Sequence, residues 1–213
     1  MSGILDLLNS DMGKTIINGV AQQSGQTTDK TSSVLTMALP VLMGAMKRNA
    51  ATPDGAQGLM GALLGKHDGS ILDNLGDLFN GGVDANVMQD GAGILGHVLG
   101  GSQNNVTNAL SQKSGIDSTT IMQILQIAAP LVMGYLGKQS KQQNVSNTTD
   151  MGDLLGSLLG GGNEAPKQQS LIESVLDGDG DGSILDDVAG MVLNSGNSQK
   201  SGLGGLLGGI FGK

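Results

Sequence analysis

The chain has 213 residues, 38% apolar and 14% charged, which is enough for one domain or two small ones around an aliphatic core. Its net charge of −8 argues against a nucleic-acid-binding protein, because contacts to phosphates require clustered Lys and Arg. The absence of cysteine excludes disulfides, iron–sulfur clusters and zinc sites with thiolate ligands.

The first residues of the chain do not resemble a secretory signal peptide. Residues 1–6 (MSGILD) lack a positive charge and carry an acid where the apolar region would begin. Nor does any uninterrupted apolar run approach the ~18 residues that a membrane-spanning helix needs. We therefore expect a cytoplasmic protein without a transmembrane segment.

Two stretches of the chain resemble each other at a constant offset of 90 residues. Residues 21–48 and 111–138 are identical at eight of 28 aligned positions, and both contain Pro-x-x-Met-Gly, beginning at Pro40 and Pro130. The identical pairs are Gln22/Gln112, Ser24/Ser114, Gly25/Gly115, Leu35/Leu125, Ala38/Ala128, Pro40/Pro130, Met43/Met133 and Gly44/Gly134. A constant register of this kind predicts an internal duplication.

Each copy predicts two shorter helices followed by a long one. The predicted ranges are 3–9, 12–23 and 28–49 in the first copy, and 91–99, 104–113 and 118–140 in the second. The second helix is expected to end at Gly25 or Gly115, since glycine readily adopts the left-handed conformation found there. The candidate N-caps of the long helix are Thr27 or Thr28 in the first copy and Asp117 or Ser118 in the second.

The long helix is apolar on nearly all sides in both copies, which is typical of a helix in the middle of a domain. Pro40 and Pro130 fall inside it, and we expect kinks there, because an internal proline costs a regular helix about 3 kcal/mol. Gly44 and Gly134, one turn later, would permit close helix packing. The fold expected is an all-α, internally duplicated bundle around two kinked central helices related by a pseudo-twofold, with a small C-terminal helix–loop–helix.

Changes in composition divide the chain into five parts. Polar stretches near residues 139–150 and 160–170 mark the boundaries, and Lys138 and Lys141, the densest basic stretch, are interpreted as part of a solvated linker. The predicted parts are a first helical repeat at 1–80, a second at 81–140, a linker with a short helix at 141–167, a calcium-loop module at 168–195 and a Gly/Leu-rich tail at 196–213.

Residues 177–188 (DGDGDGSILDDV) concentrate five carboxylates in a turn-forming sequence. Aspartates at positions 1, 3 and 5, glycine at 6 and an apolar residue at 8 match the start of EF-hand and dockerin-like calcium loops. In water, each close pair of such carboxylates repels by roughly 1 kcal/mol, which favours a bound divalent cation. The predicted calcium ligands are Asp177, Asp179, Asp181, Ser183, Asp186 and Asp187.

The end of this loop departs from the calcium-loop pattern. Position 12 is Val188 instead of a bidentate acid, so Asp186 or Asp187 must supply the last ligand. We expect a structural site of weak affinity, on the order of 10⁻⁵ to 10⁻³ M. The alternative is a solvated acidic turn in which Asp186 and Asp187 only favour the start of a helix.

Residues 68–75 repeat residues 181–188 in a degenerate form. Leu64 and Lys66 take the positions of Asp177 and Asp179, so two ligands are missing and a positive charge is added. We expect that this first copy does not bind a metal.

The duplicated Pro-x-x-Met-Gly helices, the Leu-Leu-Gly segments and the terminal acidic loop together resemble the bacterial domain-of-unknown-function family numbered 937. The resemblance covers nearly the whole chain. It implies a bacterial helical protein and carries no settled activity, substrate or catalytic residue.

An enzyme is the less favoured class of function. His67 and His97 are the two histidines, and neither has a partner at metal-ligand spacing, so both are interpreted as packing or surface residues. The sequence contains no nucleophile elbow, phosphate loop or dinucleotide fingerprint, and we predict no catalytic residues.

The remaining alternatives concern the apolar segments. The tail at 196–213 could lie on a membrane surface, but it is Gly-rich and weakly amphipathic, which favours self-association. The Leu/Gly segments are further candidate contacts between copies. We expect a glycine-rich, non-enzymatic structural protein that forms homo-oligomers and is stabilised by calcium.

Overall fold

The computed structural model describes residues 4–160, and its regular structure there is entirely helical. The elements are α1 (Ile4–Asn9), α2 (Asp11–Ser24), α3 (Thr28–Asn49), α4 (Pro53–Gly65), α5 (Ser70–Asp73), α6 (Leu75–Phe79), α7 (Ala85–Leu99), the 3₁₀ turn η1 (Gly100–Ser102), α8 (Gln103–Ser114), α9 (Ser118–Gln142) and α10 (Thr148–Gly160). The prediction of an all-α fold is confirmed for this part of the chain. The predicted calcium loop at 177–188, its module at 168–195 and the tail at 196–213 lie outside the described residues.

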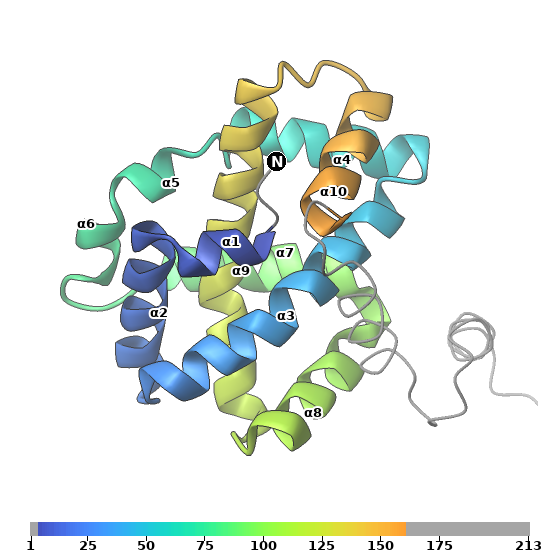
Figure 1. Ribbon diagram of the computed structural model, residues 1–213. Coiled ribbons are helices and arrows are strands. Elements are labelled where there is room, and N and C mark those ends of the chain that lie inside the picture. The colour runs from blue at the N-terminus through green and yellow to red at the C-terminus, as the bar shows by residue number, and fades with distance from the viewer. Residues whose placement is uncertain (1–3, 161–213) are drawn as a thin grey trace, which may run out of the picture.

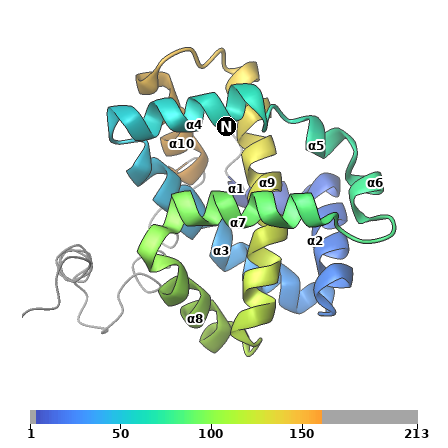
Figure 2. The same cartoon turned by 180° about the vertical axis from the view of Figure 1, so that it is seen from behind.

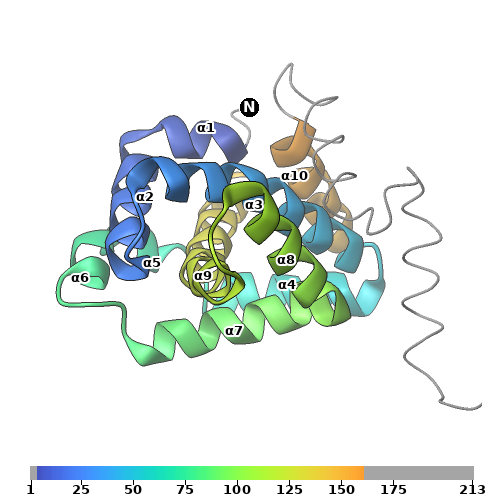
Figure 3. The same ribbon diagram turned by 90° about the horizontal axis from the view of Figure 1, so that it is seen from below.

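The helix α9 lies at the centre of the bundle. In Figure 1 it runs the length of the molecule, and α3 crosses it. Figure 2, the view from the opposite side, shows α7 crossing in front of it. Figure 3 shows α9 nearly end-on between α3 and α7. Its side chains Ile124, Leu125 and Ile127 are fully buried, as are Leu42 and Met43 of α3. The core is therefore centred on the two longest helices, the other helices add aliphatic side chains to it, and it is almost free of aromatic rings.

The predicted capping residues end α2 and α8 and begin the long helices α3 and α9. Gly25 and Gly115 cap α2 and α8 with left-handed φ angles of 64° and 66°. The side chain of Thr27 accepts a hydrogen bond from Lys30 N, and Asp117 does the same for Thr120 N. The predicted C-terminal glycines are confirmed, and each pair of candidate N-caps resolves to its first member.

The neighbours of the long helices correspond in the two halves of the chain. The helix α2 packs against both α3 and α9, and α8 packs against both α9 and α3. The prolines Pro40 and Pro130 lie inside α3 and α9 and are both buried.

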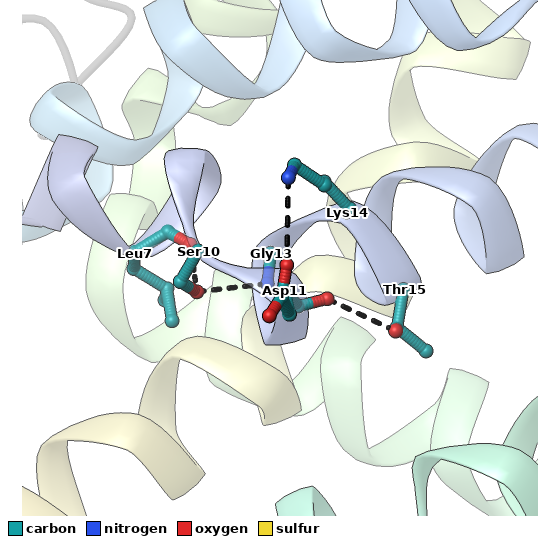
Figure 4. A network of polar contacts seen from close by, with 6 residues as sticks. All are labelled: Leu7, Ser10, Asp11, Gly13, Lys14 and Thr15. Atoms are coloured by element: carbon teal, nitrogen blue, oxygen red, sulfur yellow. Dashed lines mark hydrogen bonds and ion pairs between the residues drawn. The ribbon is translucent and has the colours of Figure 1, made fainter.

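A tight junction joins α1 to α2 (Figure 4). The Ser10 hydroxyl donates to the carbonyl oxygen of Leu7 at 2.6 Å and accepts from Gly13 N at 3.1 Å, so a single side chain ends one helix and caps the next. A Cβ at Gly13 would collide with the Leu7 carbonyl oxygen. Lys14 pairs with Asp11 at the exposed start of α2. The bend between these helices thus depends on glycine at position 13.

The segment after α9 also belongs to the core. Within residues 141–167, α10 packs against α3 and α4, and it buries Met151, Leu154, Leu155 and Leu158. The leucines of this Leu/Gly segment are therefore used inside the chain.

By length and composition α9 could cross a membrane, with a mean hydropathy of 1.4 over its most apolar 18 residues. In the structure, 72% of that window is buried against other helices. The core helix of a bundle has the same length and hydropathy, so these two properties do not make α9 a membrane span.

The crossing of α7 over α9 depends on one glycine, and this generates a prediction. A Cβ at Gly91 would collide with the carbonyl oxygen of Gln126, whereas a Cβ at Gly93 on the same helix meets no atom within 4 Å. We expect Gly91→Ala to lower the free energy of unfolding by about 1–3 kcal/mol or more. The control Gly93→Ala should raise it by about 0.5–1 kcal/mol through helix propensity. Urea unfolding measures both, and equal stability of the two variants would contradict the close crossing.

Candidate functional site

A cavity of about 770 Å³ lies between α4 and α7. Met46 of α3, Ile94 of α7 and Met133 of α9 give it an apolar lining, and both histidines of the chain contribute to its polar wall. Its volume falls in the range of about 300–1,000 Å³ that is typical of small-molecule sites. It is therefore the first candidate site in the described part of the chain.

Capping residues set the positions of the two helices that form the cavity. The Thr52 hydroxyl accepts from Gly55 N at the start of α4, and Asp84 accepts from Asn86 N at the start of α7. The side chain of Asn49, at the end of α3, donates to the carbonyl oxygens of His97 and Val98 at 3.0 and 3.1 Å. This double hydrogen bond ties α7 to the central helices.

At one end of the cavity, His67 lies beside an ion pair. Its Nε2 is 3.6 Å from Oδ2 of Asp90, whose other oxygen is 2.5 Å from Nζ of Lys66. Burial lowers the pKa of His67, the Asp90 carboxylate partly offsets this, and the Lys66 ammonium lowers the pKa further. The imidazole is consequently neutral near pH 7 and can offer one donor and one acceptor to a ligand.

The structure places both histidines on the wall of one cavity. The interpretation of His67 as a packing residue agrees with its 6% exposure, and His97 is exposed, but both line the same cavity. Their spacing of 30 residues gives no helical or strand periodicity from which this meeting could have been predicted. Within residues 4–160, no group of three or more His, Cys, Asp or Glu side chains could hold a metal ion.

The degenerate loop at 68–75 directly follows His67, which lines the cavity. Asp68 accepts a hydrogen bond from Ser70 N at 3.1 Å, and its other oxygen lies 2.9 Å from Nζ of Lys141. Asp73 pairs with Lys138 at 3.4 Å. The hydrogen bond from Lys141, together with those from Ser70, holds the pKa of Asp68 well below its usual range.

The two lysines were misinterpreted from the sequence. Lys138 and Lys141 are not part of a solvated linker, because both lie on α9. Each supplies a positive charge to one carboxylate of the loop, Asp73 or Asp68. A spacing of three residues on a helix could have suggested a shared face, but not which acids it meets.

The loop lies directly on the backbone of α9. A Cβ at Gly137 would collide with the carbonyl oxygen of His67, and a Cβ at Gly134 would stand 2.5 Å from Cγ2 of Ile71. Glycine at these two positions therefore lets the turn approach the helix, and the lysines that follow neutralise the acids of the turn.

The predicted calcium ligands are not part of either described feature. All six lie outside residues 4–160, so the structure does not test whether they come together. They are Asp177, Asp179, Asp181, Ser183, Asp186 and Asp187. The structure does describe the degenerate copy of their loop, at residues 68–75.

Comparisons with known proteins identify one family. The sequence model described as "Bacterial protein of unknown function (DUF937)" matches residues 6–139 and 141–213. No curated protein and no solved structure matches the chain.

The buried imidazole predicts a pH dependence of stability. The unfolded chain binds a proton at the ordinary histidine pKa of 6.5, while the folded chain binds it only at lower pH. The contribution of the neutral His67 side chain to the free energy of unfolding is thus fully present above pH 6.5, and it is lost as the pH falls through the lowered pKa of His67. Thermal melting between pH 7 and 5 should show this loss in the natural chain, and His67→Gln should reduce it.

The matched control is His97→Gln, which changes the exposed histidine of the same cavity. It should retain the loss of melting temperature below pH 6.5. The aspartates with lowered pKa values, such as Asp68 and Asp117, act below their ordinary value of 3.8 and do not overlap this window. An unchanged pH profile in His67→Gln would show that another group titrates.

Proposed function

The chain belongs to the bacterial DUF937 family, and we propose that it is a non-enzymatic structural protein stabilised by calcium at its C-terminal acidic loop. In this proposal the loop holds the metal, and copies of the chain associate with one another. The proposal assigns no catalytic role to any residue of the cavity.

A single observation carries the calcium proposal. Residues 68–73 and 181–186 have the same sequence, DGSILD, and in the first copy both carboxylates are paired with lysine ammonium groups. In the copy that the structure describes, each acid of this turn therefore has a cation beside it. In the C-terminal copy, Asp177 and Asp179 replace Leu64 and Lys66, which adds two negative charges and removes one positive charge.

The donor set of the C-terminal copy fits calcium. It offers carboxylate oxygens together with the carbonyl oxygen of Ser183, and hard oxygen donors are the ligands that calcium prefers. The proposed ligands are Asp177, Asp179, Asp181 and Ser183, with Asp186 or Asp187 as the last. Since Val188 stands at position 12, we propose an affinity on the order of 10⁻⁵ to 10⁻³ M.

We also propose that the two halves arose by internal duplication and that α3 and α9 are kinked at Pro40 and Pro130. The shared caps and the exchanged packing of α2 and α8 support the duplication. The kinks are supported by the missing backbone donor at each proline. The proposed calcium loop at 177–188 then corresponds to residues 64–75 of the first half.

Self-assembly is proposed for the apolar surface that remains after folding. The leucines Leu154, Leu155 and Leu158 of α10 are buried and Leu159 is partly buried, so we do not propose this Leu/Gly segment as a contact between copies. Leu64 is 60% exposed at the end of α4, and the tail at 196–213 is apolar. These two features are the proposed contacts, and the membrane surface is the alternative partner of the tail.

Isothermal titration calorimetry with calcium tests the metal site. The natural chain should release or absorb heat on binding one ion, and Asp179→Asn combined with Asp181→Asn should remove that heat, because two charged ligands are lost. The control is Asp68→Asn combined with Asp73→Asn in the first copy, which should leave the heat unchanged. Absence of heat in the natural chain would rule out the calcium proposal.

Light scattering on the same samples tests self-assembly. The natural chain should form a homo-oligomer, and removal of residues 200–213 should reduce its mass toward that of the monomer. A monomer at high protein concentration, both in calcium and in chelator, would contradict the proposed assembly.

A further inference from the structure

One face of α3 is more open than the matching face of α9. At the offset of 90 residues, Gly44 and Lys47 correspond to Gly134 and Gly137. The two glycines of α9 are buried beneath residues 67–72, which form the loop after α4 and the start of α5. In contrast, Gly44 is partly exposed and Lys47 is exposed. The equivalent helix thus lacks, within residues 4–160, the covering that α9 has.

The chain contains a second copy of the segment that covers α9. In the described copy, Ile71 sits against Gly134, where a Cβ would stand 2.5 Å from its Cγ2. The identical sequence DGSILD at 181–186 places Ile184 at the position of Ile71. Gly44 is likewise a glycine and is partly exposed, so no side chain of its own covers this point of α3.

The charges on α3 fit the same occupant. On α9, Lys138 pairs with Asp73 of α5 at 3.4 Å. Lys138 corresponds to Arg48 of α3, which is exposed, and Asp73 corresponds to Asp186 of the C-terminal copy. Lys141, the partner of Asp68, corresponds to Ala51. One of the two cations of the first copy is therefore kept on α3 and the other is missing.

Lys47 limits how closely the segment can approach α3, whereas the length of the connection lets it reach that helix. At the matching position of α9, a Cβ on Gly137 would collide with the carbonyl oxygen of His67, so beside Lys47 the segment must lie further from the helix than the first copy does. Nζ of Lys47 lies 3.8 Å from the place of a Cβ on Gly156, so the end of this side chain lies over α10. From Gly160 to Asp177 the chain has 17 residues, which at about 3.3 Å per residue can span roughly 50 Å. The acidic segment can therefore reach any part of α3.

We propose that residues 177–188 of this chain dock on the α3 surface formed by Gly44 and Arg48, with Ile184 against Gly44 and Asp186 paired with Arg48. The inference rests on the calcium loop proposed above and assigns the surface that this loop binds. Calcium then takes the place of the cation that Lys141 supplies in the first copy.

Engineered cysteine pairs test this contact directly, since the natural chain has no cysteine. The test pair is Gly44→Cys with Ile184→Cys, and the calibrating pair is Gly134→Cys with Ile71→Cys at the contact that the structure describes. There the two Cβ atoms lie within the roughly 3.5–4.5 Å that a disulfide spans. Both full-length variants are oxidised with calcium and with chelator, and non-reducing electrophoresis with mass spectrometry identifies the bonds.

We expect most of the chain in both variants to form an intramolecular disulfide. If the calibrating pair forms and the test pair does not, the docking is overturned. A disulfide that joins residues 44 and 184 of two different chains also overturns it, because a second copy is then the occupant. Calorimetry on the natural chain separates the two proposals: heat without the bond retains only the calcium site, and the bond without heat retains only the docking.

A second pair covers the case in which Gly44→Cys does not fold. Arg48→Cys with Asp186→Cys uses an exposed position of α3, and a short bis-maleimide joins the thiols across the length of the former ion pair. Its control is Lys138→Cys with Asp73→Cys. Linkage in the control and not in the test pair overturns the docking.

Discussion

A turn that carries two carboxylates, Asp68 and Asp73, packs against the backbone of α9, and two lysine cations lie at the point of contact. On α9, glycine at positions 134 and 137 removes the side chains that would hold the turn away. Lys138 and Lys141 then supply the charges that the acids of the turn need. These two ion pairs balance the two negative charges of the turn. The proposed calcium loop solves the same problem with a metal ion.

Glycine has a second role in this protein, because the core contains almost no aromatic rings. A core of Leu, Ile, Val, Met and Ala gains stability from many small contacts, which are numerous only when helices pack closely. Gly91 allows α7 to cross α9 at its backbone, and Gly13 allows α2 to turn sharply against α1. Part of the glycine content within residues 4–160, including Gly13, Gly91, Gly134 and Gly137, therefore serves close helix packing.

Local features of the sequence predicted local features of the structure. Gly25 and Gly115 mark helix ends and Thr27 and Asp117 mark helix starts, since capping depends on only a few neighbouring residues. Contacts between distant segments were not predictable in this way. His67 meets Asp90 only because α4 and α7 lie across one cavity, and no periodicity links their positions. The pairing of Lys141 with Asp68 was missed for the same reason, because it spans 73 residues of sequence.

The most direct measurement of the central claim is the effect of calcium on thermal melting when the acidic loop is given the residues of the first copy. The double variant Asp177→Leu, Asp179→Lys copies Leu64 and Lys66. In the natural chain, calcium at 100 times its dissociation constant should stabilise the fold by about 2.7 kcal/mol, and chelator should remove this gain. The variant should melt at one temperature in calcium and in chelator, at or above that of the natural chain in chelator. A variant that still responds to calcium, or a natural chain that does not, would contradict the exchange of lysine for metal.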